Sequence, residues 1–270
     1  MKKRKILELL IILIFGAYFW GEIFSKNRNI RKENNFNVLP IVLDKKLNVA
    51  VMADIHGDTK QLEKMLLKAR DNGAELIIIA GDLIEREEKD SLRMVKTILD
   101  QSGLEYAVIP GDREKNLNNF NNVFGRDYQT IEMGMVKFIL INNASWQGLG
   151  EEQKRWIEAE VSECQEKICL AVMHKPLNNL FSVKVMGEGN EKVAAEARWL
   201  REILIASGVE RIEAADLHYS TSYELEGMRT DIVGAISRED NLQSSRYTEL
   251  MISENSIERR VVEEENDTGN

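Results

Sequence analysis

The sequence predicts an α/β domain, in which helices cover the faces of a sheet, preceded by one membrane-spanning segment. Three observations support this prediction. Short apolar runs alternate with amphipathic stretches from Leu47 onward. After Val209 most of the apolar runs have the spacing of strands, which indicates a β-rich second half. Near the amino end, residues 6–24 form an apolar stretch that only two glutamates interrupt.

Composition narrows the class of protein. Apolar residues make up 43% of the 270 residues and charged residues 30%, which is typical of a globular domain rather than a disordered chain. The net charge of −9 argues against nucleic acid as a partner, because such binders need a basic surface. Two cysteines are too few for a disulfide scaffold. Cys169 lies in the apolar run "ICLAVM", so we expect a buried small hydrophobic residue there rather than a reactive thiol.

Residues 1–24 are predicted to anchor the chain in the cell membrane as a single-pass segment. An anchor needs about 20 predominantly apolar residues, and aromatic residues 18–20 suit the membrane interface. A cleaved signal peptide is the less favoured alternative, since no small-x-small pattern follows. Basic residues flank both ends almost evenly, and we expect the amino end inside and the domain outside the cytoplasm. Residues 25–46 read as a polar linker.

The first half of the domain alternates between strand and helix. "LNVAVMAD", from Leu47, predicts a buried strand. Residues 58–73 predict an amphipathic helix, with Asp-Thr at its start and Gly at its end. A strand at "LIIIA", a helix around residues 89–102 and a strand at "YAVIP" continue the pattern.

The second half contains two more helices among many strands. Two strands are expected around a Met-Gly turn in "YQTIEMGMVKFILIN", then a helix over 150–164 and a strand at "KICLAVMH". A helix over 191–207 precedes the final strands "VERIEAAD", "STSYELEG", "RTDIVGAI", "RYTELMIS" and "SIERRVVEE". Trp146 and Trp156 are expected in the core. Residues 47–262 are therefore predicted to form one domain, with 263–270 as a disordered tail.

All three histidines of the chain follow the carboxyl end of an apolar run: His56, His174 and His218. A lone histidine there is more often structural than a ligand. Aspartates occupy the same kind of position, however: Asp54, Asp82, Asp112 and Asp216. Ligands of open α/β sheets bind outside these strand ends, and carboxylates with imidazoles form a chelating set for divalent metals. Without a cation the carboxylates would repel one another and raise one another's pKa.

These residues, taken in order, resemble the motifs of the calcineurin-like metallophosphoesterase superfamily. The resemblance covers residues 47–235 and implies a four-layer α-β-β-α sandwich. The motifs are "DIH" at 54–56, "GD" at 81–82, "GDRE" at 111–114, "MHKP" at 173–176 and "ADLH" at 215–218. Each motif is short, but five in the family's order are a strong signal.

The resemblance implies two divalent cations (Mn, Mg, Fe or Zn, with Mn favoured) that share one bridging carboxylate. The first ion would be held by Asp54, His56, Asp82 and His218. The second would share Asp82 and be held also by Asp112, His174 and Asp216. A hydroxide bridging the two metals would attack phosphorus in line with the leaving group.

Three residues depart from the family's pattern. Asp112 stands where the family has Asn and Asp216 where it has His, so the second position carries extra negative charge. We expect tighter binding of hard cations and less attraction for a phosphate dianion. Arg113 replaces the motif histidine that is thought to protonate the leaving group, and arginine cannot be a general acid. It can clamp phosphate oxygens, as expected for substrates whose leaving group needs no proton. Enzymes similar to UDP-2,3-diacylglucosamine pyrophosphatases also carry Arg there.

The chain is therefore expected to be a metal-dependent phosphohydrolase acting on a phosphodiester, phosphomonoester or pyrophosphate bond. Its substrate would be a phosphorylated small molecule or a lipid-linked one. The alternative is a catalytically impaired metal-binding pseudoenzyme that binds a phosphorylated ligand or a partner, which the three departures favour. Nothing in the sequence predicts an oligomeric state.

Three residues near the motifs carry their own expectations. Asp58 is expected to cap the helix that follows it. Glu114 is expected to support its loop rather than bind a metal. Lys175 would either contact substrate or be a solvated loop lysine.

Overall fold

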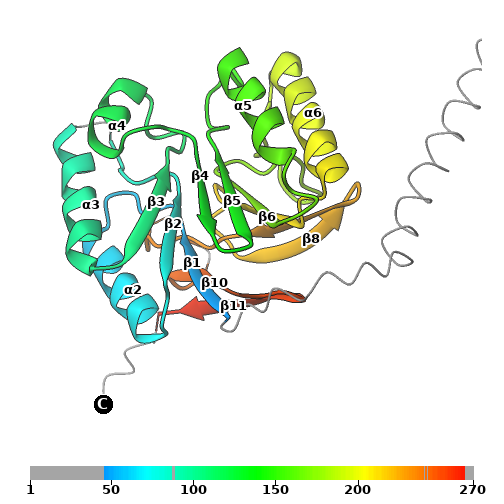
Figure 1. The fold of residues 1–270 in the computed structure, drawn as a ribbon. Helices are drawn as coiled ribbons and strands as arrows, with labels where there is room; N and C mark the ends of the chain where they lie inside the picture. Colours follow the sequence, from blue (N-terminus) through cyan, green and yellow to red (C-terminus); the bar gives the residue numbers. More distant parts are fainter. Residues whose placement is uncertain (1–45, 87–88, 240, 242, 265–270) are drawn as a thin grey trace, which may run out of the picture. The chain divides into compact units, whose positions relative to one another are not determined.

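The computed structural model describes residues 46–86, 89–239, 241 and 243–264. Within these residues the chain forms two sheets flanked by helices (Figure 1). The predicted anchor, residues 1–24, and the linker as far as residue 45 lie outside the described residues. None of the helices in the described ranges is both long and apolar enough to cross a membrane.

The first sheet has five strands in the order β11-β10-β1-β2-β3. They are β1 (Leu47–Met52), β2 (Leu76–Ala80), β3 (Glu105–Ile109), β10 (Arg246–Ser253) and β11 (Ser256–Glu263). The first three are parallel, whereas β10 pairs antiparallel with both β1 and β11. Every residue of β2 is buried, which explains its uninterrupted apolar sequence. β11 continues through Glu263, a residue predicted to begin the tail; residues 265–270 lie outside the described residues.

The second sheet has six strands in the order β4-β5-β6-β7-β9-β8. They are β4 (Gln129–Met133), β5 (Val136–Ile141), β6 (Ile168–Met173), β7 (Arg211–Ala214), β8 (Thr221–Leu225) and β9 (Met228–Ile232). β5, β6, β7 and β9 are parallel to one another, and β4 and β8 form antiparallel edges. The predicted turn between β4 and β5 is confirmed, with Gly134 at φ 63°.

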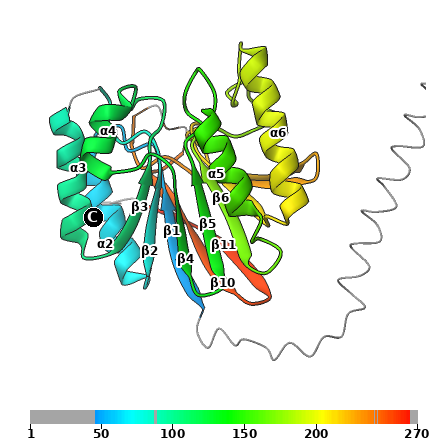
Figure 2. The same ribbon diagram turned by 45° about the horizontal axis from the view of Figure 1, so that its top comes forward.

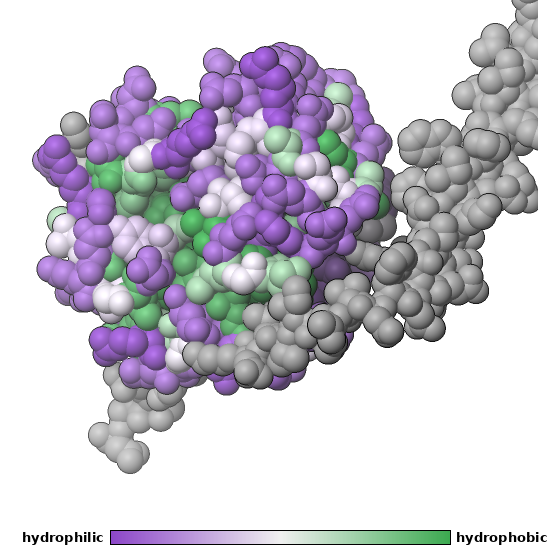
Figure 3. All heavy atoms as spheres, in the orientation of Figure 1, coloured by the Kyte–Doolittle hydropathy of each residue, from purple (hydrophilic) through white to green (hydrophobic). Residues whose placement is uncertain are grey.

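Helices cover the outer face of each sheet (Figure 2). They are α2 (Thr59–Asp71), α3 (Lys89–Ser102) and α4 (Leu117–Phe124) on the first sheet, and α5 (Glu151–Val161) and α6 (Glu191–Ser207) on the second. One apolar cluster lies under each set of helices, and a third lies between the sheets. The layers thus run helices, sheet, sheet, helices. On the face drawn in Figure 3, hydrophobic residues reach the surface in the middle, between hydrophilic residues that cover the flanks.

The capping predicted for Asp58 is confirmed, because its side chain accepts a hydrogen bond of 3.2 Å from the backbone N–H of Gln61. Helix α4 is not predicted from the sequence. Its residues, LNNFNNVF, are rich in asparagine, which has a low helix propensity. The helix forms because Asn116 caps it and because Phe120 is fully buried in the first sheet's cluster.

The structure adds to one expectation about a single residue and contradicts another. Cys169 is buried as expected, but it is not a free thiol: it forms a disulfide with Cys164, which is also buried. Cys164 lies in the turn between α5 and β6, and Cys169 is the second residue of β6. Trp146 is 67% exposed and not in the core. Trp156 is half-buried and packs beside the second sheet's cluster, against Tyr128.

Candidate metal centre

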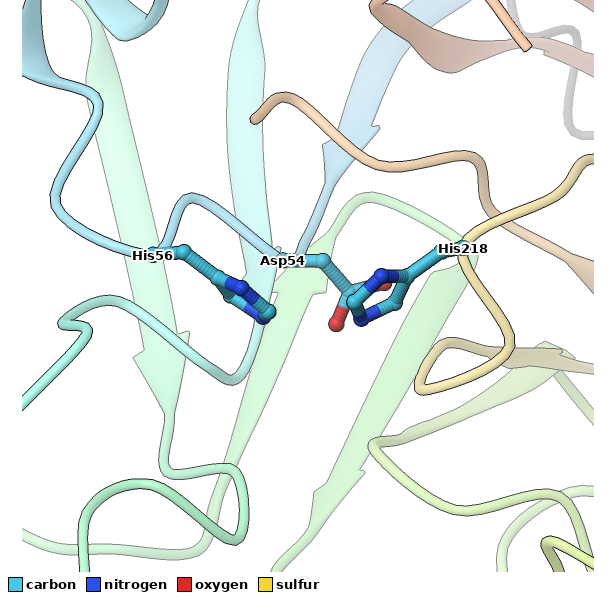
Figure 4. A group of neighbouring side chains, drawn as sticks. All are labelled: Asp54, His56 and His218. Carbon is cyan, nitrogen blue, oxygen red and sulfur yellow. The ribbon is translucent and has the colours of Figure 1, made fainter. Parts of the chain in front are cut away.

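The carboxyl ends of five strands bring all seven predicted metal ligands together. β1, β2 and β3 contribute from the first sheet, and β6 and β7 from the second. The ligand atoms fall into three overlapping groups, each within 4.8 Å: Asp54, His56 and His218; Asp54, Asp82 and His174; Asp112, His174 and Asp216. Figure 4 shows the first group, in which both imidazole rings turn toward the side of Asp54. The two ring centroids are 4.7 Å apart.

The backbone at these positions is unusual. Six non-glycine residues in the described ranges have a positive φ, and five of them are predicted ligands: Asp54 (52°), His56 (48°), Asp82 (54°), Asp216 (67°) and His218 (53°). The left-handed region costs about 1–2 kcal/mol per residue, and such strain gathers at functional sites. Hydrogen bonds between loops hold it in place: the N–H of Asp54 donates to Gly81 O, and the N–H of His56 donates to Asp82 O.

Asp82 lies at the centre of the cluster and is 2% exposed. Its Oδ2 is 3.3 Å from Nε2 of His56, and its Oδ1 is 3.4 Å from Nε2 of His174. The backbone N–H of Arg113 donates to Oδ1 at 3.0 Å. One carboxylate therefore faces a histidine of each predicted ion position, which is the placement expected of a bridge.

Several buried atoms of the cluster that could bind a metal have no hydrogen-bond partner. They are both carboxylate oxygens of Asp54, Nε2 of His56 and Nε2 of His174. Nδ1 of His174 lies 2.9 Å from the carbonyl of Ala80, so this nitrogen donates and Nε2 is left to face the cluster. Leaving a buried polar atom unsatisfied costs about 1–3 kcal/mol. A divalent cation would satisfy these oxygen and nitrogen atoms together, so the donor set fits one.

The pKa values show how far the cluster departs from ordinary side chains. Burial raises the pKa of Asp54 to about 7, although the charge of His174 opposes the shift. Burial acts in the same direction on Asp82, but His174 and His56 outweigh it and hold its pKa below the usual range. Burial lowers the pKa of His174, yet the carboxylates around it raise it to about 9. The charged form of Asp82 is thus stabilised by the two imidazoles and by the backbone N–H of Arg113.

The two Gly-Asp motifs pack back to back beside His174. A Cβ added to Gly81 would lie 2.7 Å from Cα of Gly111 and 2.7 Å from Nδ1 of His174, and Gly81 has φ 95°. A Cβ on Gly111 would collide with the carboxylate of Asp82. Both positions therefore need glycine, because only glycine lets the loops after β2 and β3 approach so closely.

Glu114 joins these same loops, which confirms its expected supporting role. Its buried carboxylate accepts N–H bonds from Asp82 (3.0 Å), Leu83 (3.0 Å), Ile84 (3.2 Å) and Gly111 (2.7 Å). Burial and the charge of Asp82 raise the pKa of Glu114 to about 7. Glu114 thus fixes the backbone that carries Asp82.

Glu114→Ala is expected to lower the free energy of unfolding by about 3 kcal/mol, since it leaves buried N–H groups without an acceptor. Urea denaturation measures the change. Glu105→Ala is the matched control, because Glu105 is exposed at the start of β3. Equal losses in the two variants would contradict the role given to Glu114.

Lys175 is not a solvated loop lysine. Its Nζ lies 3.0 Å from Oδ2 of Asp112 and 3.9 Å from Oδ2 of Asp216, and its side chain is only 23% exposed. These are the two carboxylates that depart from the family's pattern. The sequence placed Lys175 beside His174 but gave no signal for its direction.

Arg113 pairs with different carboxylates from Lys175, namely Asp82 and Glu85. Its Nη1 donates to Oε1 of Glu85 at 3.0 Å, and Glu85 Oε2 is 3.6 Å from Nδ1 of His56. Glu85 was not predicted as part of the site. A pocket of about 510 Å³ opens over the cluster, and both Arg113 and Lys175 line it.

Comparisons with known proteins identify the family and the fold of the chain. The profile of the calcineurin-like phosphoesterase family matches residues 47–225. TT1561 of Thermus thermophilus is similar at TM-score 0.56 and 15% identity, over 80% of this chain and 98% of that one. GAP50, the anchor in the inner membrane complex of Plasmodium, is similar at TM-score 0.60 and 12% identity, over 81% and 85%. Purple acid phosphatase PPD1 from yellow lupin (Lupinus luteus) seeds is similar at TM-score 0.56 and 13% identity, over 80% and 51%. Among curated proteins, none matches the chain.

Proposed function

This chain belongs to the calcineurin-like phosphoesterase family of metal-dependent phosphoester hydrolases, and we propose that it works with divalent cations held on either side of Asp82. Family membership favours the hydrolase over a catalytically impaired binding protein. The proposal is carried by one observation: buried oxygen and nitrogen donors without partners converge on a single carboxylate.

The two proposed ion positions use different residues. The first is formed by Asp54, His56, Asp82 and His218. The second shares Asp82 and adds Asp112, His174 and Asp216. When bound, such ions supply a water-derived nucleophile at neutral pH and neutralise charge on a phosphoryl group. We favour Mn²⁺ among the hard cations, because carboxylate oxygens predominate in the second set.

Arg113 is proposed to bind the phosphoryl group. Its side chain lines the pocket and is 32% exposed, so a substrate oxygen can reach it, and its Nε lies 3.7 Å from Oδ2 of Asp82. Arginine donates two parallel hydrogen bonds to phosphate but cannot release its proton. The site therefore favours a leaving group that needs no proton, as in phosphoanhydrides and activated esters.

Arg113→His tests this role. The wild type is expected to cleave a p-nitrophenyl phosphodiester far faster than an alkyl phosphodiester. In the variant the ratio of these two rates is expected to fall by ~10-fold or more, because histidine can protonate a poor leaving group. Steady-state kinetics with added Mn²⁺ measure both rates. Arg113→Lys is the control, since lysine keeps the charge. An unchanged ratio in Arg113→His would oppose the assignment.

We further propose that the domain lies outside the cytoplasm, anchored through residues 1–24, and acts on a phosphorylated small molecule or a lipid-linked one. The Cys164–Cys169 disulfide supports this location, because disulfides persist in oxidising compartments. Exposed Leu180, Phe181 and Val183 precede Lys184, which lines the pocket, and such apolar side chains would suit a lipid-linked substrate. Thiol labelling of freshly lysed cells, with and without reductant, tests the location: free cysteines in native protein would contradict it.

A further inference from the structure

We propose that Lys175 is a resident cation of the second ion position, so that the chain binds one divalent ion tightly and a second only when Lys175 is displaced. The inference rests on the proposed metal centre and concerns how that centre fills. It assigns Lys175 a role in setting the metal content of the site.

The ammonium group lies between the carboxylates that would hold the second ion. Lys175 Nζ is 3.0 Å from Asp112 Oδ2 and 3.9 Å from Asp216 Oδ2. These two carboxylates, with His174, form one of the candidate ion-binding groups. The lysine therefore contacts two of the three groups that distinguish this position from the first.

The backbone of Lys175 is fixed, which keeps the ammonium group near these carboxylates. The N–H of Lys175 donates to Oδ1 of Asn143 at 3.0 Å, and its carbonyl accepts from Nδ2 of Asn143 at 2.6 Å. Asn143 is 1% exposed and lies two residues after β5. One buried amide thus holds both polar groups of the lysine backbone.

Among the described residues, no lysine or arginine pairs with Asp54, the carboxylate that belongs to the first position alone. Both oxygens of Asp54 and Nε2 of His56 are buried and without a hydrogen-bond partner. The ion pairs of Arg113 go to Glu85 and to the shared Asp82. Asp54, the carboxylate specific to the first position, therefore has no lysine or arginine partner in the described part of the chain, whereas both carboxylates specific to the second position lie within 4 Å of Lys175.

An ammonium group and a divalent ion cannot occupy the same carboxylate oxygens. To enter the second position, an ion must break the Lys175–Asp112 ion pair and overcome repulsion from the displaced ammonium. Two charges about 4 Å apart interact strongly even at the effective dielectric of a protein surface, so removing the lysine charge is expected to tighten the second ion by roughly 10- to 100-fold.

Calorimetric titration of metal-free full-length protein with Mn²⁺ tests the proposal. The wild type is expected to bind one ion per chain tightly and a second at least ~10-fold more weakly. Lys175→Met is expected to increase the affinity for the second ion only. Lys184→Met is the matched control, because Lys184 lines the same pocket on an exposed loop, and it is expected to behave as the wild type. Electron paramagnetic resonance should show coupled Mn²⁺ pairs at a lower Mn²⁺ concentration in Lys175→Met than in the wild type.

Two equally tight ions in the wild type, or an unchanged second ion in Lys175→Met, would overturn the role of Lys175 alone. Failure of the wild type to bind any ion would overturn the metal centre itself, and the role of Lys175 with it. The first ion's isotherm reports whether each variant is folded. Lys175→Gln, which keeps a polar end, should reproduce the effect if the lost charge is its cause.

Discussion

Asp82→Asn is expected to lower kcat/KM for bis-p-nitrophenyl phosphate with added Mn²⁺ by at least ~100-fold. Asp82 is buried between His56 and His174, and both proposed ion positions use its carboxylate. An amide of the same size removes the negative charge that the two ions would share. Steady-state hydrolysis measures the loss, and ion binding in the same variant should weaken at both positions.

Asp58→Asn provides the matched control. It makes the same chemical change two residues after His56, but asparagine keeps the oxygen that accepts from the N–H of Gln61. Activity near the wild-type value is expected. Equal rates for the wild type and Asp82→Asn would sink the catalytic role of this carboxylate.

Gly81→Ala is expected to lower the free energy of unfolding by about 3 kcal/mol and to abolish hydrolysis. The added methyl group would meet the backbone of Gly111 and the ring of His174 at 2.7 Å, in a residue already at φ 95°. Relieving the contact must shift the loops that carry Asp82 and Asp112. Urea denaturation and the hydrolysis assay measure the two effects.

Gly103→Ala is the control that separates the cost of backbone strain at positive φ from the cost of the steric contacts of the added methyl group. Gly103 has φ 71°, but no atom lies within 4 Å of an added Cβ there. This control is therefore expected to lower the free energy of unfolding by only about 1 kcal/mol and to retain hydrolytic activity. If the two alanine variants lose equal stability, the close packing of the Gly-Asp motifs has no special role.

Most of the fold can be predicted from the sequence, because the apolar pattern of each segment agrees with the burial of that segment in the structure. The apolar run of β2 is typical of a buried strand, and the amphipathic pattern of α2 is typical of a helix. In each case the residues at the two ends also indicate where the element begins and ends. Helix α4 could not be predicted in this way. Its asparagine-rich sequence favours no structure alone, and the burial of Phe120 against the first sheet stabilises the helix.

The site is predicted in position but not in geometry. Strand ends place His56 and Asp82 at one edge, because parallel strands end on the same side of a sheet. Their left-handed backbone is imposed by hydrogen bonds between loops, which single-sequence patterns do not contain. The direction of Lys175 depends likewise on Asn143, a residue 32 positions earlier in the chain. The Cys164–Cys169 disulfide is not predicted, because the apolar residues around Cys169 indicate only that it is buried.

The dependence of hydrolysis on divalent ions tests the central claim most directly. Purified protein is stripped with a chelator, and Mn²⁺ is then titrated while hydrolysis and bound ions are measured together. Metal-free protein is expected to retain less than ~1% of the activity, and activity should return as ions bind to the wild type but not to Asp82→Asn. Full hydrolysis by metal-free protein would contradict the metal centre proposed at Asp82.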